Sequence, residues 1–236
     1  MKIQNSRKSD VLLLITYFVF YTLVLSLLLA FAAAHIPLFR NGVVYYGAYG
    51  AGTLLTFLIF FWQKKKVLRE DFEKFRAHFG KNCRVVFLAL FIIYLCNILI
   101  NLLLQHFHIN NQNQNVLGGL AAGGYLWLLI LLAVVFAPVV EELVFRNIIF
   151  NRLYPKNHLL AYLVSMVTFS LLHGAAALTS GKLRDMLATL IYLPLAFFLC
   201  RLYETRKNII FPIALHFVNN LLAVLLLLLL QAVKGA

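Results

Sequence analysis

Charged residues are scarce in this chain, and their scarcity excludes a water-soluble globular protein. Only 12% of the 236 residues are charged, whereas 63% are hydrophobic and the mean hydropathy is +0.87. Soluble domains are about half apolar and about a quarter charged. A chain of this size cannot hide so much apolar surface in one core, so lipid must surround most of its length. The composition therefore predicts a polytopic membrane protein.

Cysteine is rare as well. The three cysteines, Cys83, Cys96 and Cys200, lie far apart and show no CxxC spacing. This excludes a disulfide framework and a zinc cluster built on cysteine. We expect three free thiols.

Acidic residues are the third scarcity, because 8 Asp and Glu stand against 21 Lys and Arg. In a soluble protein, the resulting net charge of +13 would indicate nucleic-acid binding. Here most basic residues lie in short connections between apolar runs, where they meet anionic headgroups. We therefore expect a lipid bilayer with an anionic inner leaflet as the partner, and no nucleic acid.

Long apolar runs are what the chain has in abundance, and each approaches or exceeds the ~17 residues that a bilayer requires. The runs cover residues 11–34, 43–62, 85–104, 116–140, 159–179, 186–200 and 208–230. Pro138 cannot donate a backbone hydrogen bond, so a helix should kink or begin afresh there. The fold class predicted is an all-α, polytopic transmembrane helical bundle with seven spans, or eight if this proline splits one.

The first apolar run has a basic start and a small-residue end, as a signal peptide has. It is longer than the ~7–15 residues of a signal peptide's hydrophobic region, so we interpret it as a transmembrane anchor. The basic residues concentrate on alternate connections, beginning with the N-terminal segment. By the positive-inside rule, this predicts a cytoplasmic N-terminus, and the short outer loops favour a protein integral to a bacterial plasma membrane.

The chain is interpreted as one structural domain with two parts. Residues 1–115 hold N-terminal transmembrane helices and a basic interfacial loop, and residues 116–236 hold a helical core that contains the candidate site residues described below. Within the basic loop, aromatic and aliphatic residues recur at three- and four-residue steps, a pattern typical of a helix lying in the membrane interface. These residues are Leu68, Phe72, Phe75 and Phe79.

Two glutamates inside an apolar stretch are the main anomaly. Glu141 and Glu142 interrupt it, and Arg146 follows one turn later. At ~2.5–3.5 kcal/mol for each mid-helix charge, the three would cost roughly 8 kcal/mol before pairing. Glu142 and Arg146 are four residues apart, so they can form a structural ion pair. Glu141 is rotated away from this arginine, and a desolvated carboxylate without its own cation suits a general base or acid.

Later spans add two histidine clusters, in which His173 follows Phe169 by four residues and His216 precedes Asn220 by four. Such spacings also arise by chance, so depth decides, and Glu141, His173 and His216 all fall within the bilayer interior. Hydrogen bonding between packed helices would explain each histidine alone equally well. Taken together with the acid, they favour a water-activating site. The remaining histidines fall in or beside predicted connections: His35, His78, His106, His108 and His158.

This ordered set resembles the three motifs of the CPBP family, the CAAX proteases and bacteriocin-processing enzymes that are also called the Abi family. The matching motifs are Glu141-Glu142-x-x-x-Arg146, Phe169-x-x-x-His173 and His216-x-x-x-Asn220. The resemblance covers roughly residues 120–225. Asn147 departs from it, since many members have glycine after the motif arginine.

The resemblance implies a helical intramembrane endopeptidase that hydrolyses a peptide bond near the cytoplasmic membrane face. By that resemblance, Glu141 and His173 would activate the attacking water, and His216 and Asn220 would stabilise the oxyanion. A carboxylate can accept a water proton, and an imidazole and an amide can donate to developing negative charge. The residues expected to support this site are Glu142, Arg146 and Phe169.

Two alternatives stay open. Glu141, His173 and His216 could bind zinc in a metal-dependent version of the same protease, although no HExxH motif demands it and we expect no cofactor. A non-enzymatic transporter or immunity membrane protein is the other alternative, but no inverted repeat is visible. Under the protease hypothesis the partner is a peptide or protein substrate in or at the membrane. The family resemblance implies that cleavage of this substrate would serve bacteriocin processing or self-immunity.

Overall fold

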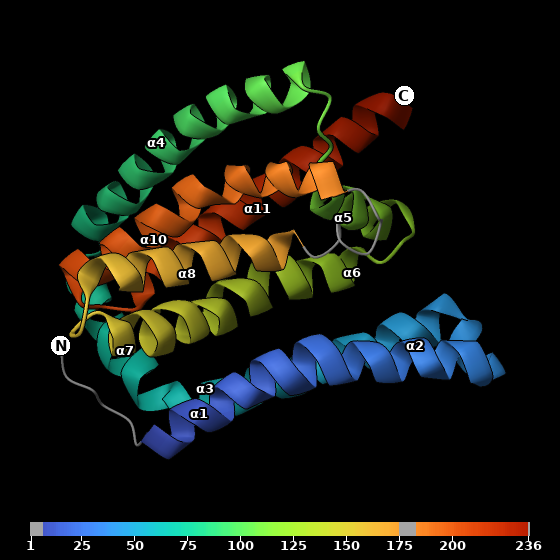
Figure 1. Ribbon diagram of the computed structural model, residues 1–236, viewed down its shortest axis with the longest axis horizontal. Coiled ribbons are helices and arrows are strands. Elements are labelled where there is room, and N and C mark those ends of the chain that lie inside the picture. The colour runs from blue at the N-terminus through green and yellow to red at the C-terminus, as the bar shows by residue number, and fades with distance from the viewer. Residues whose placement is uncertain (1–6, 175–182, 236) are drawn as a thin grey trace.

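A computed structural model describes residues 7–174 and 183–235, which form helices and no strand (Figure 1). The first elements are α1 (Arg7–Ile15), η1 (Thr16–Leu25), α2 (Ser26–His35), η2 (Pro37–Arg40), α3 (Gly42–Arg76), α4 (Phe79–His106) and α5 (Gln112–Ala122). The later elements are α6 (Leu126–Leu129), η3 (Ile130–Glu141), η4 (Leu143–Phe150), α7 (Asn151–Leu153), α8 (His158–His173), η5 (Leu183–Tyr192), α10 (Leu193–Arg206) and α11 (Ile210–Gly235). Three of these, η1, η3 and η4, are π-helical, and η2 and η5 are 3₁₀-helical.

Consecutive elements join into helices of membrane-spanning length, and a shorter apolar helix covers His158–His173. Among the described residues, six helices are long and apolar enough to cross a membrane: Lys8–His35, Gly42–Arg76, Phe79–His106, Leu126–Leu153, Arg184–Arg206 and Ile210–Val233. Large apolar side chains cover their outer faces, as a lipid environment requires. The predicted all-α membrane bundle is confirmed. The end of the predicted span 159–179 lies outside the described residues.

The fourth span does not have its predicted bounds of 116–140. The chain instead forms the separate helix α5, turns, and begins the spanning helix Leu126–Leu153. The turn contains Gly124 at φ +82°, a left-handed conformation that glycine adopts without the clash of a Cβ atom. The prediction failed because this turn is made of glycine within an apolar run. Glu141 lies inside the spanning helix Leu126–Leu153, as expected from its predicted depth.

Pro138 neither ends nor splits this helix, so the predicted fresh start at this residue is wrong and no additional span begins there. The surrounding segment is wound as a π-helix, in which hydrogen bonds join residues five apart. The missing N–H of Pro138 therefore leaves the carbonyl of Ala133 without its helical donor. The Asn220 side chain of α11 supplies a donor instead, with its Nδ2 2.9 Å from that carbonyl oxygen.

The basic segment is not a separate interfacial helix, because α3 continues as one helix from Gly42 to Arg76. Phe72 and Phe79 are 49% and 62% exposed, as expected for side chains at an interface. Phe75, in contrast, is buried, and its ring packs 4.9 Å from that of Phe211. The apolar residues of this segment thus divide between the surface and the core.

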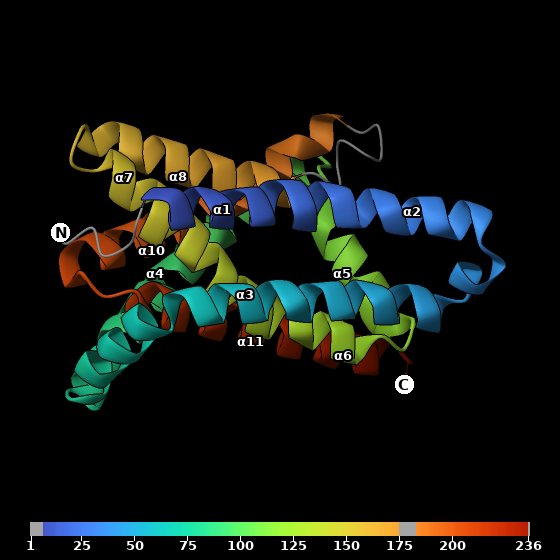
Figure 2. The same cartoon turned by 90° about the horizontal axis from the view of Figure 1, so that it is seen from below.

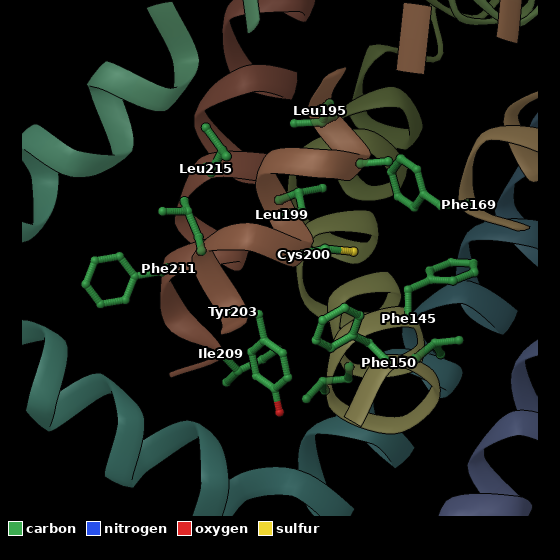
Figure 3. Close-up of a cluster of buried hydrophobic side chains, with 14 of the residues drawn as sticks. Phe145, Phe150, Phe169, Leu195, Leu199, Cys200, Tyr203, Ile209, Phe211 and Leu215 are labelled. Carbon is green, nitrogen blue, oxygen red and sulfur yellow. The ribbon is translucent and has the colours of Figure 1, made fainter. Parts of the chain in front are cut away.

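The N-terminal rod formed by α1, η1 and α2 runs beside α3, and α4 lies on the opposite side of the bundle (Figures 1 and 2). Between them, η4, α8, α10 and α11 enclose the largest buried apolar cluster (Figure 3). In this cluster, the Phe150 ring of η4 packs 6.2 Å from that of Tyr203 in α10, and the Phe145 ring of η4 packs 5.4 Å from that of Phe169 in α8. The core therefore fixes η4 and α8 against each other at the level where the polar residues lie.

Candidate active site

Glu142, Arg146 and His216 form a charge cluster that is closed to solvent. Arg146 Nη1 donates to Glu142 Oε1 at 2.9 Å, and His216 Nδ1 donates to the same oxygen at 2.8 Å. The three side chains are 0%, 0% and 1% exposed. The ion pair predicted from the four-residue spacing is confirmed, and it also binds a histidine of α11. The cluster thereby ties α11 to the helix that contains Glu142 and Arg146.

Phe169 lies at the centre of these groups. Its buried ring is 4.6 Å from the Arg146 guanidinium, an arrangement that permits a cation–π interaction. The same ring packs 4.7 Å from the ring of His173 and 5.6 Å from that of His216. Phe145 adds an edge-on contact at 5.4 Å. The Phe169 ring therefore contacts both histidines and the arginine and sets the spacing between them.

His173 ends α8 and has a defined ring orientation. Its Nδ1 donates to the carbonyl oxygen of Phe169 at 2.9 Å, so the neutral imidazole carries its free lone pair on Nε2. The ring of Tyr192, from η5, packs against it at 4.5 Å. Arg146 and Glu142 lie within electrostatic range of the ring. The geometry leaves Nε2 as the atom that can accept a proton.

Glu141 is 8% exposed and has no salt bridge among the described residues. The hydroxyl of Tyr17, from η1, donates to its Oε1 at 3.4 Å. Its Oε2 is buried and has no hydrogen-bond partner within the part of the chain that the structure describes. His216 and Arg146 lie within electrostatic range of the carboxylate. Glu141 is thus the unpaired acid of the two, as the sequence predicted.

Asn220 lies one turn beyond His216 on α11 and faces the backbone of η3. One amide hydrogen is used on the carbonyl of Ala133, and the amide oxygen accepts a hydrogen bond from Asn219 at 3.0 Å. A primary amide has two hydrogens, so one remains for another acceptor. The structure brings Asn220 to the helix of the two glutamates through the carbonyl that Pro138 leaves free.

Comparison with known proteins gives two findings. Residues 123–222 match the model of the family described as Type II CAAX prenyl endopeptidase Rce1-like. These residues form an Rce1-like segment. A curated relative is the "Putative membrane peptidase YdiL" of Bacillus subtilis (strain 168), 31% identical over 121 residues. That alignment covers 51% of this chain and 46% of the relative, so the chain spans about half the length of the curated protein it matches. No solved structure gives a significant match.

The family resemblance inferred from the sequence is confirmed for the Rce1-like segment, and every predicted site residue lies within it. Asn147, the departure from the family pattern, has a local explanation. Its Oδ1 accepts from Lys64 Nζ at 2.9 Å, and its Nδ2 donates to the Tyr203 hydroxyl at 3.3 Å. The side chain therefore joins α3 and α10 to η4, next to the charge cluster.

Sequence reasoning missed two tyrosines that contact the predicted site. Tyr192 of η5 lies inside the Rce1-like segment and packs on His173. Tyr17 lies outside the segment, 124 residues from the glutamate that it contacts. No local spacing connects residues so far apart. The available signal was weaker, namely a tyrosine within an otherwise apolar first span.

Among the described residues, no three His, Cys, Asp or Glu side chains are grouped as a metal site requires. The zinc alternative thus gains no support from the placement of these side chains. The histidines set aside from the sequence are all exposed: His35, His78, His106, His108 and His158.

Proposed function

We propose that this protein is an intramembrane endopeptidase that hydrolyses a peptide bond near the cytoplasmic membrane face. The observation that carries the proposal is the pairing of two unlike acids on one helix. Glu142 is ion-paired with Arg146 and bonded to His216 through Oε1, whereas Glu141 has no ion pair among the described residues and lies within electrostatic range of the same groups. The Oε2 atoms of both acids are buried without a hydrogen-bond partner in the part of the chain that the structure describes, so it is the charge pairing that distinguishes the two acids. Such a division of roles is useful for proton transfer and has no evident use in packing. The match of the Rce1-like segment supports the same class of reaction.

Glu141 and His173 would activate the attacking water. The free Oε2 of Glu141 accepts a proton from water, and the lone pair on His173 Nε2 accepts a hydrogen bond from the same molecule. The hydroxide equivalent then attacks the carbonyl carbon of the scissile peptide. A carbon–oxygen bond forms, and the negative charge moves to the former carbonyl oxygen.

His216 and Asn220 would stabilise that oxyanion. The bond of His216 Nδ1 to buried Glu142 fixes the ring, and a hydrogen on Nε2, at the other side of the ring, would donate to the oxyanion. Asn220 contributes its second amide hydrogen. Glu142, Arg146 and Phe169 hold the histidine in place. Collapse of the intermediate breaks the carbon–nitrogen bond, and the leaving amine takes the proton that Glu141 accepted.

The test compares membrane peptidomes of cells that carry wild type, Glu141→Gln or His173→Ala. New N-termini are labelled and quantified in isolated membranes, and the amount of folded protein is measured in the same samples. Glu73→Gln and His158→Ala are the matched controls, because the Glu73 side chain is 56% exposed and His158 is also exposed.

We expect one set of new N-termini to depend on both site residues, with a loss of ~10²-fold or more, since general acid–base groups contribute 10²–10⁴-fold. The two controls should match wild type. Full cleavage by a folded Glu141→Gln variant would end the assignment. Proton-coupled flux in proteoliposomes, without proteolysis, would favour the transporter alternative.

The remaining parts of the proposal concern the surroundings of the reaction. We propose a metal-free reaction, a cytoplasmic N-terminus, contact of the basic segment with anionic lipid, and a peptide or protein substrate in or at the membrane. A role in bacteriocin processing or self-immunity follows from the resemblance of the motifs. The identity of the labelled N-termini tests the substrate, and accessibility of a tag placed before residue 7 tests the orientation.

A further inference from the structure

The first helix presents one polar and aromatic face to the bundle. Asp10, Leu13, Tyr17 and Tyr21 follow one another at steps of three and four residues, and they are 5%, 0%, 1% and 8% exposed. Their neighbours on the other face, such as Phe20, are largely exposed. Because three- and four-residue steps share one helix face, this helix has a single preferred rotation toward the rest of the protein.

A buried ion pair holds this helix at its start. Lys64 Nζ lies 2.8 Å from Asp10 Oδ1, and Arg152 Nη2 lies 2.7 Å from Asp10 Oδ2. Lys64 comes from α3, and Arg152 comes from α7, which follows η4 directly. The same carboxylate therefore joins the first helix to α3 and to the end of the helix that contains Glu141. Tyr17 lies two turns further along the same face as Asp10.

Tyr17 lies on the helix face that Asp10 fixes, and it contacts the candidate active site. Its ring stacks on Tyr21 at 6.0 Å and meets Phe145 edge-on at 6.2 Å. Its hydroxyl donates to Glu141 Oε1. The distance of 3.4 Å is long for such a bond, and contacts of catalytic groups are often long until a reacting water or substrate is present.

We infer that Tyr17 is a positioning residue for Glu141, and that the first helix is therefore part of the active site although it lies outside the Rce1-like segment. The hydroxyl occupies Oε1, which leaves Oε2 as the oxygen that faces the reacting water. Without it, a carboxylate in a water-poor interior would turn toward the nearest positive charge, in Arg146 or His216. The role in catalysis rests on the function proposed above, whereas the contact itself can be tested without it.

The decisive variant is Tyr17→Phe, which keeps the ring and removes only the hydroxyl. Tyr21→Phe is its matched control, because Tyr21 lies on the same helix face and receives a hydrogen bond from Tyr49. The first measurement is cleavage by the full chain in liposomes of a quenched fluorescent peptide copied from a wild-type cleavage site. The second is the infrared band of the Glu141 carboxyl group, identified by its loss in Glu141→Gln.

For Tyr17→Phe we expect kcat to fall ~10- to 100-fold with KM unchanged, the range given by loss of a hydrogen bond to a charged group. The Glu141 infrared band should shift in Tyr17→Phe and stay in place in Tyr21→Phe. A merely structural tyrosine would lower the amount of folded protein without moving the band. Retention of at least half the wild-type kcat by Tyr17→Phe, or equal losses in both variants, would overturn the inference.

The infrared measurement separates this inference from the proposed function. If wild type gives no cleavage that depends on Glu141, the protease assignment fails. A band shift confined to Tyr17→Phe would then still support Tyr17 as the residue that positions the carboxylate. An unchanged band would overturn that contact whatever the activity.

Discussion

Removal of Arg146 should destabilise the protein far more than removal of an arginine or lysine at its surface. Arg146→Met keeps a long apolar side chain but leaves the carboxylate of Glu142 with His216 alone. Both members of the ion pair are 0% exposed, and their nitrogen and oxygen are 2.9 Å apart. Breaking a buried pair from one side costs ~3–5 kcal/mol. At ~2–4 °C per kcal/mol for a chain of this length, the Tm should fall by about 6–20 °C.

The chain offers a control with the same spacing. Lys66 and Glu70 are also four residues apart, but their charged atoms are 4.0 Å apart and the side chains are 81% and 40% exposed. Surface pairs of this kind contribute ~0–1 kcal/mol. Lys66→Met should therefore change the Tm by no more than about 4 °C.

The assay is thermal unfolding of the purified full chain in detergent, followed by the fluorescence of its two tryptophans. A third variant, Glu142→Gln with Arg146→Met, removes both charges. Its Tm should lie above that of Arg146→Met alone, because no uncompensated buried charge remains. A loss for Arg146→Met no larger than that of Lys66→Met would refute the reasoning. A double variant that is less stable than the single one would do the same.

Three further outcomes are expected. Asn220→Ala leaves the carbonyl of Ala133 without a hydrogen-bond donor and should lower the free energy of unfolding by ~1–3 kcal/mol. In a Pro138→Ala background, which restores a helical N–H, the same substitution should cost much less. Equal costs in both backgrounds would contradict the π-helical explanation. Gly124→Ala should lower the free energy of unfolding by ~1–2 kcal/mol because residue 124 has a positive φ. Gly47→Ala, within α3 and with open space around it, should not destabilise the protein. Similar effects of both substitutions on thermal unfolding would contradict the strained turn. A chelator should leave cleavage unchanged, and stoichiometric, chelator-sensitive zinc in active protein by mass spectrometry would contradict the metal-free proposal.

Most of the fold could be predicted because the helices are long and apolar. Length and hydropathy alone locate the spans, as lipid leaves few other structures open to such a chain. The errors occurred where local backbone geometry competed with hydropathy. A turn at Gly124 interrupts an apolar run and shifts the fourth span, and π-helical winding with a donor from Asn220 carries the chain past Pro138.

The candidate site was predictable to the extent that its parts lie on one helix. The four-residue spacing indicated the pair of Glu142 and Arg146, which the structure confirms. His216 was predicted to share the site, but its partnership with Glu142 depends on how α11 packs against η4. Tyr17 was not predicted, because a period along one helix shows which residues share a face and says nothing about what that face meets. Such contacts follow from packing between helices.

The ion pairs of Asp10 with Lys64 and Arg152 also affect how the protein folds during its synthesis. The first helix is synthesised before both of its cationic partners, Lys64 and Arg152, which follow 54 and 142 residues later. A carboxylate near the start of an inserted helix is unfavourable in lipid until a counter-charge arrives. Lys64 is the first counter-charge to be synthesised, and both partners are present only after more than half of the chain has been made. Biogenesis of the protein should therefore depend on a surrounding that keeps the Asp10 carboxylate out of lipid until its cationic partners have been synthesised.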